Sequence, residues 1–150
     1  MEAFPRLPYE VLIPNTLFEN ELLKFTPTEK KALIRDGLQV VDLPGERVTR
    51  ARQIIRTSPR LSVNDAFAFS LAESHPGCIL LTGDGALRLI AEKHQIEVHG
   101  VLWVVDELHY HDIEAPRALH HALTTLRDDP AVRLPRPELL AALRRYARQG

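Results

Sequence analysis

The chain has 150 residues, of which 45% are hydrophobic, and its 19 basic and 20 acidic residues leave a formal net charge of -1. This balance predicts one domain with an apolar core and excludes strong nucleic-acid binding through bulk charge, although a local basic patch is still allowed. A single cysteine, no signal or transit peptide and no apolar stretch near the roughly 20 residues of a membrane helix predict a cytoplasmic protein with no membrane partner.

The N-terminal half alternates short β-branched runs with helix signals. Proline and glycine mark most of the boundaries, because proline ends strands and opens helices while glycine ends helices. These signals predict a strand over residues 9–14, helices over 15–25 and 26–37, a second strand over 38–45 and a helix over 46–58.

The second half contains the most specific patterns. Ser62 can cap a helix that is apolar on both sides, which predicts deep burial. Residues 77–82 form the continuous apolar run expected of a central parallel strand. A helix over 86–93, a strand over 96–100, a helix over 101–111 and two helices within 115–150 complete the chain. The alternation predicts an α/β fold, a parallel sheet with helices on both faces.

Two aspartates stand at predicted helix starts, beside the most apolar strand of the chain. Asp84 can be the N-cap of its helix, and Asp65 can complete a capping-box-like pattern with Ser62. Both carboxylates can also converge on a divalent cation, because ligands of α/β folds bind at the carboxyl ends of the strands. A shared metal would relieve the unfavourable burial of an unpaired carboxylate at Asp65.

Other metal and phosphate motifs are weaker. Glu19 and Glu21 lie in the helix after the first strand, and either can be a solvated residue or a third metal ligand. The histidines at residues 109–111 and 120–121 have neither a cysteine cluster nor an HExxH motif to support zinc binding. The sequence TGDG lacks the lysine of a phosphate-binding P-loop.

Several motifs together resemble the PIN domain, the nuclease fold of VapC-type toxins. DAFAFSLA at 65–72 is followed by an apolar strand ending in TGD at 82–84 and by ALRLIAE at 86–92. YEVLIPNTLFENELL at 9–23 is similar to the family's second strand and glutamate-bearing helix. The resemblance implies a PIN-like α/β domain over residues 1–112, with 113–150 as a helical C-terminal extension of the same domain.

The same resemblance implies a metal-dependent ribonuclease of the toxin–antitoxin type. Asp65 and Asp84 match two acidic positions of the family. Glu21 matches the helix glutamate by its context, although the spacing leaves Glu19 open, and Thr82 matches a supporting hydroxyl residue. These residues would bind Mg²⁺ or Mn²⁺, orient the attacking water and cleave single-stranded RNA.

One departure from the family pattern bears on activity. PIN domains normally open with a central strand that ends in a metal-binding aspartate, and this chain begins with MEAFPRLP. The expectation is either a truncated or degenerate PIN domain, or a start that omits an upstream segment. The alternative function is therefore a catalytically impaired module that binds RNA or protein. Exposed strand edges also predict a homodimer that helps to cover them.

Arginines concentrate in the C-terminal tail, with Arg144, Arg145 and Arg148 at its end. They can form a solvated helix face, bind the RNA backbone through local charge density, or meet an antitoxin-like protein partner. Trp103, the single tryptophan, is expected in the core or in a dimer interface.

Overall fold

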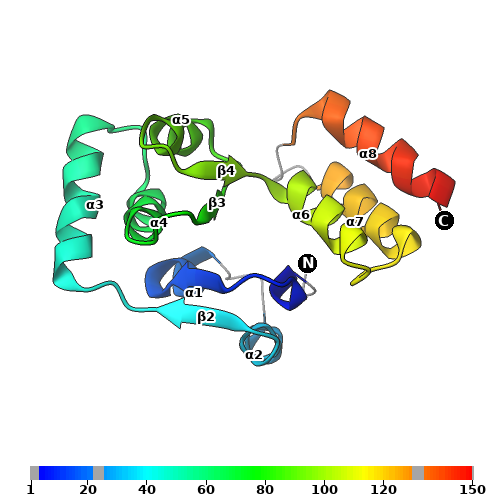
Figure 1. Cartoon of the computed structure of the whole chain (residues 1–150), viewed down its shortest axis with the longest axis horizontal. Coiled ribbons are helices and arrows are strands. Elements are labelled where there is room, and N and C mark those ends of the chain that lie inside the picture. The colour runs from blue at the N-terminus through cyan, green and yellow to red at the C-terminus, as the bar shows by residue number, and fades with distance from the viewer. Residues whose placement is uncertain (1–3, 22–25, 130–133, 150) are drawn as a thin grey trace.

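The structure is a computed structural model of the chain and describes residues 4–21, 26–129 and 134–149 (Figure 1). The helices and strands expected from the sequence are found in the described residues, with shorter strands than the patterns indicate, and residues 22–25 of the helix expected over 15–25 lie outside the described residues. In chain order the elements are η1, Phe4–Arg6; β1, Val11–Pro14; α1, Asn15–Glu21; α2, Pro27–Arg35; β2, Leu38–Val41; α3, Gly45–Thr57; α4, Val63–Glu73; β3, Ile79–Leu81; α5, Gly85–Lys93; β4, Glu97–His99; α6, Val101–Tyr110; α7, Pro116–Asp128; and α8, Arg136–Gln149.

Three of the described helices begin at a residue whose side chain caps the helix. The Thr26 hydroxyl accepts a hydrogen bond from the Glu29 backbone N–H at 3.1 Å, and the Glu29 carboxylate accepts one from the Thr26 backbone N–H at 3.4 Å. This reciprocal capping box opens α2. Ser62 and Asp84 cap α4 and α5 through their side chains. Local hydrogen bonding therefore sets these helix starts.

The four strands form two separate parallel pairs. Val11 of β1 stands opposite Leu38 of β2, and Ile79 of β3 stands opposite Glu97 of β4. Within the described residues, no strand pairing joins one pair to the other. In Figure 1, β2 points toward α3 and β4 points toward α6 at the opposite end of the molecule, so the pairs run in opposite directions. Parallel strands flanked by helices confirm the α/β class.

The position of β3 differs from the central place that its apolar run suggests. It has one strand neighbour, and Leu81 at its end is 42% exposed. Helix α4 contacts both β1 and β3. An apolar run is equally compatible with burial by a helix and with burial between two strands, because both environments exclude water.

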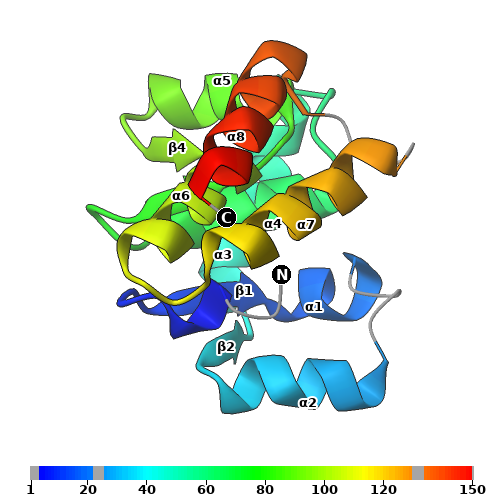
Figure 2. The same ribbon diagram turned by 90° about the vertical axis from the view of Figure 1, so that its right-hand side faces the viewer.

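The buried side chains of the described residues form three clusters, which contain the fully buried Tyr146, Phe69 and Leu33, respectively. Figure 2 faces the C-terminal helices, where α6, α7 and α8 pack on one another. Their shared core is here called the C-terminal cluster and comprises Leu7, Val104, Val105, Leu108, Leu119, Leu123, Leu139, Ala142, Leu143 and Tyr146. The deep burial expected of α4 is confirmed, since Phe69 is fully buried. Among the described helices, none has both the length and the apolar character needed to cross a bilayer.

An ion pair joins α3 to α4 and provides a test of this packing. Arg50 binds Glu73 through two hydrogen bonds, at 2.7 Å and 2.9 Å, and both side chains are about three-quarters buried. The hydrogen bond from Arg50 lowers the pKa of Glu73 below its ordinary value of 4.5. A lowered pKa means that this stabilisation is present above about pH 4.5 and is lost as the pH falls through the folded-state value.

The Glu73→Gln variant should therefore lose about 1–2 kcal/mol of unfolding free energy at pH 7, because it removes the charge and keeps the shape. Urea unfolding should show that the difference in unfolding free energy between the variant and the parent chain shrinks below pH 4.5. At that pH the Glu73 carboxylate of the parent becomes protonated and loses its charge. Asp36→Asn is the matched control, since its partner Arg35 has a 75% exposed side chain, and its loss should stay under about 0.5 kcal/mol. A pH-independent loss in Glu73→Gln would contradict the assignment.

Candidate functional site

Asp84 lies in the turn between β3 and α5. Its Oδ1 accepts a hydrogen bond from the Ala86 backbone N–H at 2.8 Å, so Asp84 is the N-cap of α5. Its own backbone N–H donates to the Thr82 hydroxyl at 3.0 Å. The Thr82 backbone N–H in turn donates to the His99 carbonyl at 3.0 Å. These bonds tie the turn to the carboxyl end of the β3–β4 pair and use only one carboxylate oxygen of Asp84.

Asp65 lies in the first turn of α4, where its backbone N–H donates to the Ser62 hydroxyl at 3.0 Å. The half-buried Asp65 side chain lies within hydrogen-bonding reach of the Asp84 carboxyl. Burial raises the pKa of Asp65 above the ordinary aspartate value, and the hydrogen bond and negative charge of Asp84 raise it further. Hydrogen bonding from Ser62 opposes this rise. Two carboxyls from different helices therefore share one site.

A pair of neighbouring carboxyls is a chemical arrangement that can accept a divalent cation. Two adjacent carboxylates repel one another when both are ionised, and a hard cation between them removes that penalty. The capping role of Asp84 does not compete with cation binding, because the cap leaves Oδ2 outside its hydrogen bond. Asp84 can therefore cap α5 through Oδ1 and still offer Oδ2 to a metal, so the two interpretations from the sequence do not exclude each other.

In the described residues, no contact brings Glu19 or Glu21 of α1 to Asp65 and Asp84. Glu19 is exposed, and α1 follows β1, whose carboxyl end points away from that of β3 (Figure 1). Glu21 is the last residue of α1, and its side chain lies outside the described part of the chain. Over residues 4–21, 26–129 and 134–149, no group of three or more His, Cys, Asp or Glu side chains is positioned to hold a metal ion.

Arg88 is a neighbour of the site that the sequence patterns did not single out. It lies one turn after Asp84 on α5, and its backbone N–H donates to the Asp84 carbonyl at 3.0 Å. A side chain built at Gly100 would meet both the Thr82 carbonyl and the Arg88 guanidinium, which therefore lie together beside the turn. The spacing in the sequence could have indicated Arg88, because it follows Asp84 by four residues and residues four apart on a helix share a face.

The tail arginines differ from one another. Arg145 binds Asp106 at 2.6 Å, and its guanidinium lies 5.0 Å from the centre of the Tyr146 ring. This pairing gives Arg145 a structural role in holding α8 to α6. Arg144 and Arg148 are exposed.

The histidines and the tryptophan form aromatic contacts. His99 stacks on Trp103 with ring centres 4.5 Å apart, and His109 packs edge-on against Tyr146. His111 pairs with Glu107 at 3.0 Å. Trp103 is half-buried against the C-terminal cluster. His109 and His111 thus contact different side chains, Tyr146 and Glu107.

Comparison with known proteins identifies the family of this fold. A family model described as DUF3368, PIN domain, matches residues 1–148. No curated protein and no solved structure gives a significant match to the chain. The match spans the two aspartates, the strand pairs and the C-terminal helices.

Proposed function

Because the chain belongs to the PIN-domain family, we propose that it is a metal-dependent ribonuclease of the toxin–antitoxin type, which hydrolyses RNA phosphodiester bonds. Proteins of this family are typically nucleases that use divalent metals. The observation that supports the proposal is the pair of carboxyls at the N-termini of α4 and α5, Asp65 and Asp84.

The residues of the pair fit a divalent cation. Mg²⁺ takes one or two carboxylates directly and keeps several waters, and Asp65 and Asp84 supply two. A bound Mg²⁺ or Mn²⁺ would activate water and stabilise negative charge on a phosphodiester. Thr82 holds the backbone of Asp84 through its hydroxyl, and Ser62 holds that of Asp65. Arg88, beside the same turn, is suited to bind a phosphate oxygen.

Cleavage of a labelled single-stranded RNA tests the proposal directly. With Mn²⁺ the chain should cut the RNA, and excess EDTA should stop the reaction, because two carboxylates hold a divalent cation only when it is available. Calorimetric titration with Mn²⁺ in the absence of RNA should show one saturable site. Cleavage that is unchanged in EDTA, or no cleavage with a folded chain and bound Mn²⁺, would contradict the metal-dependent nuclease.

A second function has one observation in its favour. Within the described residues, no third acidic side chain joins Asp65 and Asp84. The chain would then be a catalytically impaired PIN module that binds RNA or protein. RNA binding by fluorescence anisotropy without cleavage would select this function over the nuclease.

The partners in this proposal are RNA and an antitoxin-like protein. Arg144 and Arg148 are the exposed candidates for RNA phosphates, with Arg145 nearby in its ion pair to Asp106. Glu21 and Glu19 remain candidates for a further metal ligand. We also propose that the chain forms a homodimer and that residues 113–150 extend the domain of residues 1–112.

A further inference from the structure

Arg88 of α5 lies at the carboxyl edge of the β3–β4 pair. Thr82 follows β3, Gly100 follows β4, and the Thr82 backbone N–H donates to the carbonyl of His99, the last residue of β4. A Cβ built at Gly100 would lie 3.9 Å from Arg88 Nη2 and 3.7 Å from the Thr82 carbonyl oxygen. The guanidinium is therefore close to the residues that follow both strands, beside the turn that contains Asp84.

The guanidinium of Arg88 has few partners inside the protein. Among the described residues its one ion pair is with Glu92, at 3.9 Å between Nη1 and Oε1, and its side chain donates no hydrogen bond. The two side chains are 41% and 53% exposed, so the pair contributes little. In the same part of the chain Arg88 has no ion pair with Asp65 or Asp84. Its planar set of five N–H donors is thus available to a ligand, and this geometry fits the oxygens of a phosphate.

Gly100 leaves the space beside Arg88 open. Its φ of -113° and ψ of -170° are extended values that any residue adopts. The contacts that a Cβ would make there are ordinary van der Waals distances. Neither the backbone nor the packing requires glycine at this position, but a longer side chain would enter the space between the Thr82 carbonyl and the guanidinium. The missing side chain therefore keeps Arg88 accessible.

The carboxyl pair and Arg88 reach the turn from different neighbours. Asp65 belongs to the first turn of α4, whereas Arg88 lies close to Gly100, which precedes α6. In Figure 1, α4 lies on one side of β3 and α6 begins on the other side, where β4 ends. Because the guanidinium does not neutralise the acids, one edge can offer carboxylates to a metal and a cation to a phosphate.

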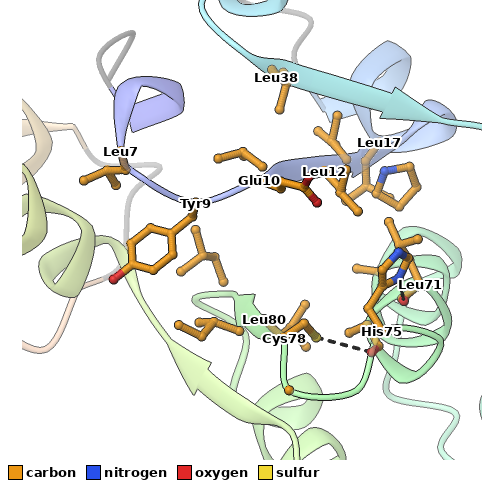
Figure 3. A pocket seen from close by; sticks show the side chains of 18 of the residues that line it. Leu7, Tyr9, Glu10, Leu12, Leu17, Leu38, Leu71, His75, Cys78 and Leu80 are labelled. Atoms are coloured by element: carbon orange, nitrogen blue, oxygen red, sulfur yellow. Dashed lines mark hydrogen bonds between the residues drawn. The ribbon is translucent and has the colours of Figure 1, made fainter.

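The apolar cavity between β1 and β3 is a separate region of the molecule (Figure 3). Its volume is about 470 Å³, and neither Arg88 nor the two aspartates line it. Among the described residues that line the cavity there is no arginine or lysine. A nucleic-acid backbone is bound mainly by cationic side chains and N–H groups, so the edge that carries Arg88 suits an RNA strand better than this cavity does.

We propose that Arg88 positions the RNA strand by binding a phosphate other than the one at the carboxyl pair. This inference rests on the proposed function, because it takes RNA as the ligand. Arg88 then acts on RNA binding, while the metal affinity belongs to Asp65 and Asp84. Phosphate contacts fix the register of a nucleic acid on a protein, so this second contact sets which bond faces the two acids.

The first arm of the test measures RNA binding without metal. The full chain is titrated into a labelled single-stranded oligouridine in excess EDTA at several salt concentrations, and binding is followed by fluorescence anisotropy. Arg88→Gln should weaken binding about tenfold and reduce the slope of log affinity against log salt concentration by about 0.7, the value for one phosphate contact on a single strand. Arg35→Gln, at a 75% exposed position of α2, removes the same charge and should keep the parent values. Parent affinity and slope in Arg88→Gln, or equal losses in Arg35→Gln, would overturn the proposal.

The second arm fills the space beside Arg88 and keeps the arginine. Gly100→Asp places a carboxylate next to the guanidinium, and this carboxylate can also cap α6, whose N-cap has no side-chain hydrogen bond. The variant should unfold at the same or a higher urea concentration than the parent and bind RNA about tenfold more weakly. Ala115→Asp is the matched control, because Ala115 is the exposed N-cap of α7 and also lacks a side-chain cap bond. The proposal fails if Gly100→Asp binds RNA as the parent does, or if both variants lose the same affinity.

The third arm separates this inference from the nuclease. In Mn²⁺, Arg88→Gln should raise the KM for RNA about tenfold, and calorimetry without RNA should give the Mn²⁺ affinity of the parent. A loss of Mn²⁺ affinity in Arg88→Gln would place Arg88 in the metal site and overturn the inference. RNA binding through Arg88 without cleavage in Mn²⁺ would contradict the nuclease and support the inference. Cleavage by Arg88→Gln with the parent KM would support the nuclease and overturn the inference.

Discussion

The Asp84→Asn variant should cleave RNA at least about a hundredfold more slowly than the parent chain in Mn²⁺, while its unfolding free energy changes by no more than about 0.5 kcal/mol. Asparagine keeps the side-chain oxygen that accepts from the Ala86 backbone N–H, so α5 keeps its cap. It removes the negative charge through which Asp84 would hold a hard cation in the proposed nuclease. Initial cleavage rates, Mn²⁺ titration and urea unfolding measure the three quantities.

Two further variants separate the roles of Asp84. Asp84→Ala removes the cap as well as the charge and should lose about 1 kcal/mol of stability in addition to activity. Asp128→Asn, an exposed acid at the end of α7, is the matched control and should keep both. If Asp84→Asn cleaves RNA at the parent rate, Asp84 is only a helix cap and the metal site lies elsewhere.

The parts of this structure that the sequence predicts are those set by local chemistry. Ser62 and Asp84 were expected as possible helix caps, and each caps a helix through its side chain. A cap depends on residues within one helical turn, so it can be recognised in the sequence without knowledge of how distant segments pack. The burial of α4 follows in the same way from apolar residues on both of its sides.

The parts that the sequence does not predict depend on pairings between distant segments. The run 77–82 is apolar in either a central or an outer strand, and only its neighbours decide between them. β3 has one neighbour in the described residues. The direction of β1 relative to β3 likewise decides where Glu19 lies with respect to Asp84. No periodicity within one segment contains that information.

Local sequence motifs also predict only part of the candidate site. Asp65 and Asp84 could be proposed because each marks a helix start after a recognisable motif, and the structure brings their carboxyls together. Arg88 was missed because its importance comes from the approach of Gly100, which belongs to the turn after β4. Local motifs therefore supply the acids, while long-range packing brings the Arg88 guanidinium close to the turn that contains Thr82.

Tyr146→Ala should lower the unfolding free energy by about 3–5 kcal/mol, the largest stability loss expected here. Tyr146 is 1% exposed in the C-terminal cluster, and its hydroxyl donates to Asp106 at 2.5 Å. Tyr146→Phe keeps the ring and loses only this hydrogen bond, so its loss should be about 1–2 kcal/mol. Urea unfolding followed by circular dichroism and by the fluorescence of Trp103 measures both, and Tyr110→Phe, at a 79% exposed position, is the control.

The pH dependence of Tyr146→Phe gives this assignment a second test. Burial, together with Asp106, raises the pKa of Tyr146 from 10.0 to about 12. A raised pKa means that the stabilisation is complete below pH 10 and is lost as the pH rises through the folded-state value. The stability difference between the parent and Tyr146→Phe should therefore shrink above pH 10.

Cooperativity decides whether the C-terminal helices belong to the same domain as the strands. Leu7, which precedes β1, lies in the C-terminal cluster with residues of α6, α7 and α8. Because one core then includes both ends of the chain, Tyr146→Ala should shift a single unfolding transition that both probes report at the same urea concentration. Separate transitions, in which the Trp103 fluorescence shifts and most of the circular dichroism signal does not, would instead make α6, α7 and α8 a unit that unfolds independently of the strands.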